Sequence, residues 1–376
     1  MPAGGRLRVL CAPNTFKGTL SAPAAAAALA AGVRDAGAEA TTAPMADGGD
    51  GTLDTLLAGS GWSRCDRHPV HGPLGGRLIA RLGWLDAATA VVELAEAAGL
   101  RRLRSRREPL RASSRGAGDL IRHALDGGAG RILVGIGGSA CSDGGAGLLA
   151  ALGARLLDRR GRHLADGGGS LVELDQADLA GLDPRLRGCQ IEVATDVDSP
   201  LLGARGAAAV FAPQKGASPD QVERLEAGLR HLAAVLERDA GIAPELRDLP
   251  GAGAAGGSGY GLAAAGARLV PGAALVAEAV GLDRAIAAAD LVVTGEGRLD
   301  GQTAAGKAPI EVARRAARRG APCIAVAGVV ESVPAGFHRA IALTELAAPD
   351  ESAERMPRRL LRRAGALLVR DAVRGG

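Results

Sequence analysis

Aromatic side chains are scarce in this chain, whose 376 residues include only 2 Trp, 1 Tyr and 3 Phe. Proteins that hold single-stranded nucleic acid stack its bases on aromatic rings and gather basic residues on one face. Here the net charge is only +4, and the arginines of 314–319 and 358–363 recur on expected helices as solvated faces. We therefore expect no nucleic-acid partner.

The 5 cysteines are widely spaced and include no CxxC pair. This spacing argues against both a zinc site and a disulfide framework. No uninterrupted apolar run is long enough for a membrane helix, and the N-terminal segment MPAGGRLRVL lacks the apolar region of a signal peptide. The expectation is a soluble cytoplasmic protein with no membrane partner.

Three common catalytic motifs are missing as well. The chain contains no GxxxxGK[ST], no GxSxG and no HExxH sequence, which argues against a P-loop enzyme, a nucleophile elbow and a zinc metalloprotease. Glycine is nevertheless abundant, with 57 residues, and its clusters mark places where the backbone turns sharply or approaches a ligand. We therefore expect the functional residues to lie in these glycine clusters.

Short apolar runs alternate with helical segments, which is typical of an α/β protein with a mainly parallel sheet. The first run, Leu7–Cys11, precedes an alanine-rich helix for which Ser21 is the expected N-cap. The expected strands of this doubly wound sheet are 7–11, 40–44, 131–136, 291–294, 322–327 and 340–344.

A second, mixed α/β domain is expected to be inserted into the first. Its candidate strands include Leu78–Trp84, Ala90–Leu94, Ile191–Ala194 and Ala207–Phe211. The expected boundaries assign 1–61, 113–155 and 284–376 to the discontinuous first domain, and 62–112 and 156–283 to the inserted domain. Small ligands usually bind in clefts between domains, so we expect the site there.

Two polar clusters follow the first two strands. Lys17 lies in the turn 12–21, just before a helix N-terminus that favours an anion. In the segment ADGGDGT at 46–52, Asp47 and Asp50 stand three residues apart among glycines. Such carboxylates can hold a hydrated cation or accept the proton of a substrate hydroxyl.

A third and denser glycine cluster, GIGGSACSDGGAG at 135–147, follows the expected strand 131–136. Its backbone N–H groups can face phosphate oxygens, and Gly137, Gly138 and Ser139 are the candidate contacts. Asp143 falls in the same turn and is a candidate magnesium ligand.

Two further clusters add charge and glycine. Asp196 follows the run 191–194, and Lys215 lies in a glycine-flanked turn, so the two offer a carboxylate and a cation. The loop 250–257 precedes a helical stretch and can wrap phosphates at a positive helix end; its candidates are Gly253, Gly256 and Gly257. The loop after strand 291–294 carries both charge signs, on Glu296, Arg298, Asp300 and Lys307.

Two stretches, at 135–140 and 251–256, also fit the GxGxxG-like dinucleotide pattern, and Asp158 lies about 20 residues beyond the first, where a ribose-binding acid belongs. An NAD-dependent oxidoreductase is therefore the alternative enzyme class, and a non-catalytic anion-binding module is a third. A dehydrogenase needs no set of loop lysines, however, and residues 245–250 show no strand pattern. A binding module leaves the carboxylates beside the glycine loops unexplained, so a kinase is favoured.

At these motifs the chain resembles the class I glycerate kinases, a bacterial family that acts on D-glycerate. The shared motifs run in order through nearly the whole chain: AP-x3-K-x2-LS at 12–21, ADGGDGT at 46–52, SSRGAG at 113–118, GIGGSA-x2-DGGAG at 135–147, PQKGA at 213–217, PGAGAAGG at 250–257 and TGEG-x2-D-x-QT-x2-GK-x-P at 294–309. The resemblance implies two α/β domains, of which the first is Rossmann-like and discontinuous. It also implies a phosphotransferase that uses ATP and Mg²⁺ to form 2-phosphoglycerate.

The chain departs from the common family pattern at a few positions. Asp50 stands in place of glutamate, Thr195 in place of cysteine, Glu311 in place of glycine, and Cys141-Ser142 in place of Thr-Asn. None of these departures removes a charged group, so activity is expected. A 3-phosphoglycerate product remains open as an alternative, because moving the substrate by one carbon would change the hydroxyl that reacts. The sequence is silent on oligomeric state, and a homodimer remains open.

The resemblance and the chemistry of the side chains together suggest roles. Asp47 is the candidate general base, and Arg298 and Lys307 are candidates for binding the glycerate carboxylate. Glu296 and Asp50 are further substrate-binding candidates, while Lys17 and Asp196 join Asp47 as candidate catalytic residues. The ATP phosphates are expected against the loops 135–139 and 251–257, aided by Lys17 or Lys215, with Mg²⁺ on Asp143 and Asp196.

Overall fold

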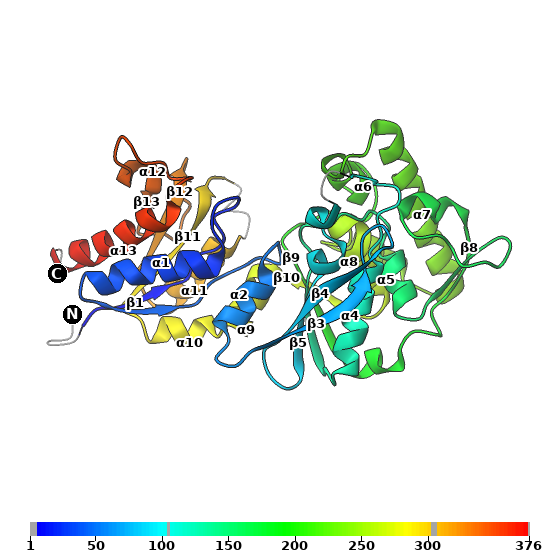
Figure 1. Ribbon diagram of the computed structural model, residues 1–376, viewed down its shortest axis with the longest axis horizontal. Helices are drawn as coiled ribbons and strands as arrows, with labels where there is room; N and C mark the ends of the chain where they lie inside the picture. Colours follow the sequence, from blue (N-terminus) through cyan, green and yellow to red (C-terminus); the bar gives the residue numbers. More distant parts are fainter. Residues whose placement is uncertain (1–5, 104–105, 302–306, 375–376) are drawn as a thin grey trace. The chain divides into compact units, whose positions relative to one another are not determined.

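The computed structural model describes residues 6–103, 106–301 and 307–374. The chain falls into two compact units, each built from separate stretches. Unit 1 comprises Met1–Asp47, Asp54–Gly61 and Ala273–Gly376, and unit 2 comprises Gly48–Leu53 and Trp62–Gly272. The α/β class, the parallel sheet and the discontinuous arrangement predicted from the sequence are confirmed (Figure 1).

In the described residues, unit 1 contains a five-stranded sheet in the order β13-β12-β11-β1-β2. All of its neighbouring strands pair in parallel. The strands are β1 (Arg8–Cys11), β2 (Glu39–Thr42), β11 (Leu291–Leu299), β12 (Cys323–Val330) and β13 (Arg339–Ala342). The buried run of β1 and the start of β11 form the core of this unit together with the helices beside them.

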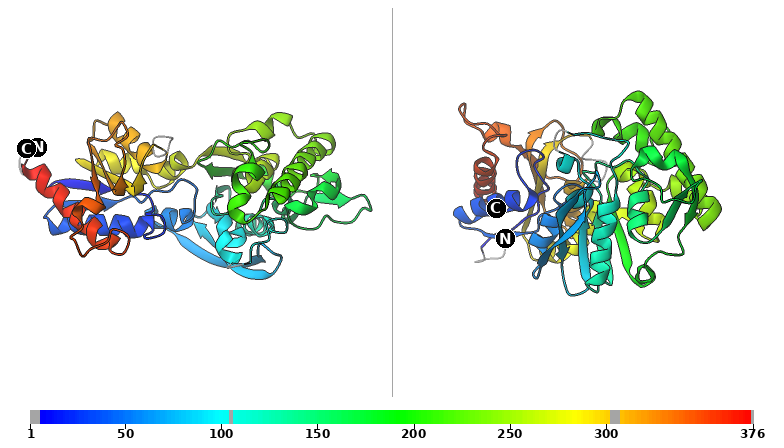
Figure 2. Two further views of the ribbon diagram at one scale, coloured as in Figure 1. Left: turned by 90° about the horizontal axis from the view of Figure 1, so that it is seen from above. Right: turned by 45° about the vertical axis from the view of Figure 1, so that its right-hand side comes forward.

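Helices cover both faces of this sheet (Figure 2). On one face α1 (Ala22–Asp35) packs closely on α13 (Pro357–Arg374), where a Cβ on Gly32 would lie 1.8 Å from the carbonyl oxygen of Arg362. On the other face α11 (Ala308–Arg318) lies against β11 and β12. The remaining helices are α2 (Thr52–Gly59), α9 (Gly272–Ala279), α10 (Leu282–Ala287) and α12 (Leu343–Leu346). Ser21 is the N-cap of α1, as predicted, but its side chain makes no capping hydrogen bond.

Unit 2 is built on a mixed sheet, which in the described residues has six strands in the order β10-β9-β6-β5-β4-β3. The strands β5, β6, β9 and β10 are parallel, whereas β3 and β4 form an antiparallel edge. Their bounds are β3 (Arg64–His71), β4 (Arg77–Trp84), β5 (Thr89–Glu93), β6 (Arg131–Gly135), β9 (Gln190–Thr195) and β10 (Arg268–Pro271). A separate hairpin pairs β7 (Arg155–Asp158) with β8 (Leu174–Asp178).

Two buried clusters form the core of unit 2. One packs the sheet against α3 (Leu94–Ala98) and α4 (Arg115–Asp126), and the other surrounds the long helix α7 (Pro219–Ala240). A capping box of Ser218 and Gln221 begins α7, which satisfies backbone N–H groups of its first turn. The other helices are α5 (Ala146–Ala151), α6 (Ala207–Phe211) and α8 (Ala254–Ala264). The 3₁₀ helices are η1 (Leu100–Leu103), η2 (Gly168–Glu173), η3 (Pro184–Gly188), η4 (Pro213–Lys215) and η5 (Pro244–Asp248).

The structure corrects three sequence-based expectations. The run 131–136 does not join the first sheet, because β6 pairs with β5 and β9 in unit 2. The expected boundaries were therefore wrong for 48–53 and 113–155, which belong to unit 2, and for 273–283, which belongs to unit 1. The run Ala207–Phe211 is a helix rather than a strand, in keeping with the high helix propensity of its three alanines.

None of the helices in the described residues has the length and apolar character needed to cross a membrane.

Candidate functional site

In unit 1, polar residues gather where β1 and β11 end. These neighbouring strands mark the point where the chain order of the sheet reverses, and ligands of open α/β sheets bind beyond the carboxyl ends of strands at such a point. Asn14 follows β1, and its backbone N–H donates to Gly295 O at 2.7 Å. The hydroxyl of Thr294 donates to Ala12 O at 2.7 Å. These bonds hold the two strand ends together.

Asp47 lies at this edge. It is half-buried, and Nδ2 of the buried Asn14 donates to its Oδ2 at 3.3 Å. Lys17 is exposed in a tight turn in which Phe16 N–H donates to Leu20 O at 2.9 Å. Its backbone nitrogen would lie 3.4 Å from a Cβ on Gly297, so the turn packs on the strand that also carries the buried Glu296. The structure thus brings Asp47, Lys17 and Glu296 to one end of the sheet of unit 1.

Two further charged candidates of unit 1 are Arg298 and Lys307. Arg298 lies on β11 and forms an ion pair with Glu331. The half-buried Lys307 is the N-cap residue of α11, and the motif residues 302–306 lie outside the described residues. Glu311, one of the departures from the family pattern, is buried and pairs with Arg314 and Arg315 of its own helix. The two arginines balance the negative charge of Glu311, so this buried carboxylate needs no ligand.

In unit 2, the carboxyl ends of the adjacent parallel strands β5, β6 and β9 carry the candidate groups. Glu93 ends β5 in register with Gly135, which ends β6. Gly137 and Gly138 follow, the first half-buried and the second exposed, and Asp196 follows β9 with an exposed side chain. Backbone N–H groups and a carboxylate therefore share one edge of this sheet, the edge at which ligands bind in such folds.

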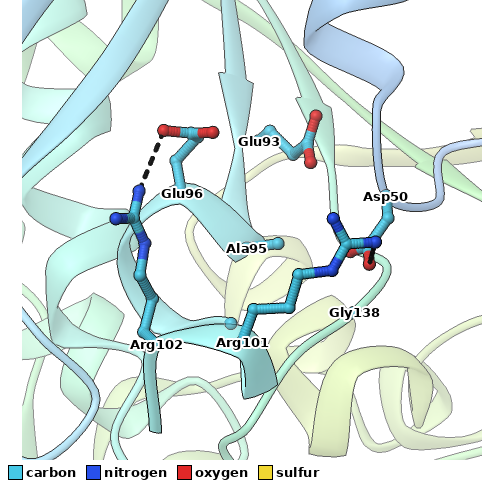
Figure 3. A pocket seen from close by; sticks show the side chains of 8 residues that line it. Asp50, Glu93, Ala95, Glu96, Arg101, Arg102 and Gly138 are labelled. Atoms are coloured by element: carbon cyan, nitrogen blue, oxygen red, sulfur yellow. Dashed lines mark hydrogen bonds and ion pairs between the residues drawn. The ribbon is translucent and has the colours of Figure 1, made fainter. Parts of the chain in front are cut away.

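A pocket of about 300 Å³ opens at this edge, and its lining is strongly charged (Figure 3). Asp50 and Arg101 form an ion pair at 2.9 Å on one side of it, and Glu96 and Arg102 form one at 3.1 Å on the other. The carboxylate of Glu93 lies between these pairs, and Gly138 lies beside Asp50, where a Cβ on Gly138 would be 1.8 Å from Asp50 Oδ1. Two candidates from the sequence, Asp50 and Gly138, are brought together here.

Glu93 is a residue that the sequence analysis missed. Only 5% of it is exposed, and its two carboxylate oxygens accept hydrogen bonds from Gly51 N–H at 3.0 Å and from Leu53 N–H at 2.9 Å. Burial raises the pKa of Glu93, although these two N–H donors oppose the rise. An acidic residue at the end of the apolar strand TAVVE was the signal that could have identified it.

Lys215 and Ser139 form a buried polar contact behind the glycine turn. The ammonium of Lys215 donates to Ser139 Oγ at 3.0 Å and to the carbonyl oxygen of Cys141. Lys215 is only 2% exposed, and burial lowers its pKa because the ammonium loses its hydration. Both hydrogen-bond partners are neutral, and no ion pair forms on Lys215 within the part of the chain that the structure describes. A buried cation with neutral partners attracts an anion.

Asp143 has a different place from the one predicted. It is fully buried, and its Oδ2 accepts hydrogen bonds from the N–H and the hydroxyl of Ser114 at 2.8 and 2.9 Å. Further donors are Ser113 Oγ and the N–H groups of Gly145 and Gly147. Burial raises the pKa of this carboxyl. Its oxygens are occupied by internal donors, so Asp143 does not fit a direct magnesium ligand, and it instead joins the N-termini of α4 and α5.

The glycines of the loop 250–257 are buried against the chain itself. A Cβ on Gly253 would lie 2.2 Å from Pro200 O, and one on Gly257 would lie 2.7 Å from Gly144 Cα. Gly256 O accepts from Gly144 N–H at 3.0 Å. Gly256 and Gly257 thus permit close packing on the turn 141–145, and Gly253 permits close packing on Pro200, which explains these glycines without a phosphate. The GxGxxG-like stretch here follows η5 and not a strand, and Asp158 pairs with Arg162 at 2.7 Å.

No group of three or more His, Cys, Asp or Glu side chains is arranged to hold a metal ion in residues 6–103, 106–301 and 307–374. The described candidates thus form two sets. Unit 1 brings together Asp47, Lys17 and Glu296, and unit 2 brings together Asp50, Gly137 and Gly138 with Ser139 and Lys215 behind them.

Comparisons with known proteins point to one family. A sequence model described as the glycerate kinase family matches residues 9–372. A glycerate kinase from Bacillus subtilis is 45% identical over 86% of this chain and 85% of its own, and a glycerate 2-kinase from Escherichia coli is 44% identical over the same shares. A crystal structure from Salmonella typhimurium LT2, assigned as glycerate kinase 2, superposes with a TM-score of 0.87 at 41% identity and covers 99% of both chains. The chain therefore belongs to the glycerate kinase family, as its ordered motifs predict.

Proposed function

We propose that this protein transfers the γ-phosphoryl group of ATP to the 2-hydroxyl of D-glycerate, forming 2-phospho-D-glycerate and ADP. The observation that supports this most directly is the 44% identity to a glycerate 2-kinase across 86% of the chain. In the reaction the hydroxyl oxygen forms a bond to the γ-phosphorus and the bond from that phosphorus to the β-phosphate oxygen breaks. The hydroxyl proton passes to a base.

Phosphoryl transfer depends on positioning and on neutralising charge. We assign the ATP phosphates to the glycine turn at Gly137 and Gly138, whose backbone is accessible, with the buried Lys215 and Ser139 behind it adding positive charge. The buried Gly256 and Gly257 pack on residues 141–145, which follow this turn in the chain.

Magnesium bound to ATP would supply charge neutralisation at the phosphates. Of the two predicted ligands, Asp196 fits this role because its carboxylate is exposed at the end of β9, whereas Asp143 is enclosed by internal donors. We therefore keep Asp196 as the group that approaches the metal.

Asp47 is the proposed base, since it lies half-buried beside Asn14, which orients its carboxylate. Arg298 and Lys307 are the proposed partners of the glycerate carboxylate. Lys17 and Glu296 are kept as further polar groups of unit 1, and Asp50 as one at the pocket of unit 2. Arg298 must exchange its surface pairing with Glu331 for the substrate, which costs little because exposed ion pairs are weak.

Replacing Asp47 tests this assignment. Asp47→Asn keeps the shape and removes the proton acceptor, so kcat should fall by roughly 10²-fold or more, while the KM for ATP should change little. The exposed Glu39→Gln, which removes a carboxylate from the same unit, is the matched control and should have wild-type kinetics. Wild-type turnover of Asp47→Asn would rule out Asp47 as the base.

A further inference from the structure

The segment Gly48–Leu53 is the short stretch of unit 2 that directly follows Asp47 in the chain. It begins with Gly48, whose carbonyl oxygen accepts from Gly137 N–H at 2.9 Å. The fit is close: a Cβ on Gly137 would lie 2.4 Å from Gly49 Cα, and one on Gly48 would lie 2.4 Å from Ala194 O. The segment therefore lies against the glycine turn that we assign to phosphate.

Glu93 holds the other end of this segment. Its carboxylate accepts hydrogen bonds from the N–H groups of Gly51 and Leu53, at 3.0 and 2.9 Å. These N–H groups belong to the start of α2, where a helix leaves backbone donors without partners. Glu93, which lies on strand β5, thus caps the N-terminus of α2, a role that a residue next to the helix in sequence usually has.

Further close contacts hold the segment Gly48–Leu53 against strands β5 and β6. Glu93 is in register with Gly135 on the neighbouring strand, and a Cβ on Gly135 would lie 3.3 Å from both Gly48 O and Thr52 Cβ. Thr52 also closes the segment on itself, since its hydroxyl donates to Gly49 O at 2.7 Å. The backbone between Asp47 and α2 is consequently attached at both ends to the strands that carry the glycine turn.

We propose that Glu93 is a positioning residue for phosphoryl transfer: by binding the N–H groups of Gly51 and Leu53 it fixes the segment Gly48–Leu53, which directly follows Asp47 in the chain. This proposal rests on the proposed function for its catalytic part. Reaction rates fall steeply when a reacting group moves by about 1 Å, so loosening this attachment impairs turnover more than binding.

The test compares Glu93→Gln with the matched control Glu192→Gln. Glutamine keeps the size of the side chain, but its amide group can accept from only one of the two N–H donors. Glu192 is also buried in the same sheet, and it pairs with Arg131 and Arg268 without touching the segment. The comparison thus separates the effect of losing any buried carboxylate from the effect of losing the hydrogen bonds to Gly51 and Leu53.

Two readouts are measured. In hydrogen exchange resolved to single amides, Gly51 and Leu53 should be protected in the wild type and should exchange at least about tenfold faster in Glu93→Gln, with no change in Glu192→Gln. In D-glycerate kinase assays, kcat of Glu93→Gln should fall by roughly 10- to 100-fold, while the KM values for ATP and glycerate stay within about threefold.

Faster exchange with unchanged kcat, or an equal fall of kcat in both variants, would overturn the proposal. If Glu93→Gln does not fold, hydrogen exchange of the wild-type protein still tests the proposed hydrogen bonds of Glu93. Unprotected Gly51 and Leu53 amides in the wild type would contradict these bonds. A wild type that protects these amides but does not phosphorylate D-glycerate would instead refute the proposed function, and with it the catalytic role of Glu93.

Discussion

At the scale of single residues, burial separates the candidate groups into those that can meet a ligand and those that hold the fold. Asp143, Lys215 and Glu93 are all buried, yet they differ in their partners. Asp143 is enclosed by donors, Lys215 contacts neutral oxygens, and Glu93 binds two backbone N–H groups. A structural carboxylate and a ligand-binding one differ in their hydrogen-bond partners. The sequence does not show these partners.

Replacing Asp143 tests its structural role. Asp143→Ala leaves several buried donors without an acceptor, so the free energy of unfolding should fall by roughly 3 kcal/mol or more, because each unpaired buried donor costs about 1–3 kcal/mol. Urea unfolding of this variant and the wild type measures the change.

The milder Asp143→Asn keeps part of the hydrogen bonding and provides the kinetic comparison. Its magnesium concentration for half-maximal activity should stay within about twofold of the wild-type value, since Asp143 does not fit a direct ligand. An increase of more than about tenfold in this magnesium concentration would show that Asp143 does bind the metal.

At the scale of elements, the glycine clusters serve two different purposes. The turn at Gly137 and Gly138 leaves accessible backbone beside a charged pocket, whereas the loop 250–257 packs on residues 141–145. The sequence predicted that both clusters follow strands or precede helices and serve phosphate binding. It could not separate close packing from ligand binding, because both require the absence of a side chain.

This difference predicts unequal costs for two glycine replacements. Gly257 has a φ of +87° and lies against Gly144, while Gly241, the C-cap of α7, has a φ of +65° and open space around its Cβ position. Both alanine variants pay for the left-handed backbone, about 1–2 kcal/mol. Gly257→Ala should lose about 1–3 kcal/mol more, because its methyl group meets backbone. Equal losses in thermal or urea unfolding would show that the loop is not closely packed.

Strand pairing shows the same limit on sequence-based prediction. Most strands of the two larger sheets were expected near their observed positions, since short apolar runs between helices define them. The strands β7, β8 and β10 were not expected. The run 131–136 was assigned to the wrong sheet, however, because its apolar pattern is that of any strand buried on both faces and does not name its neighbours. Glu93 escaped notice for a related reason: its partners, Gly51 and Leu53, are more than a strand and a helix away in the sequence.

At the scale of the whole molecule, the order of the motifs along the chain was the most informative feature. Seven motif segments in family order predicted the family, and the match over residues 9–372 confirms it. The two-unit α/β organisation also agrees with a related crystal structure that covers 99% of the chain. What the motif order does not specify is the hydroxyl that receives phosphate, since both products use the same ATP chemistry.

The most direct test of the central claim is therefore a product assay with the purified protein, D-glycerate, ATP and Mg²⁺. Enolase is added alone, and phosphoenolpyruvate is followed; phosphoglycerate mutase is then added in a parallel reaction. We predict phosphoenolpyruvate with enolase alone, which requires 2-phosphoglycerate as the product. A signal that appears only with the mutase would mean transfer to the 3-hydroxyl, and no signal in either reaction would contradict the proposed function.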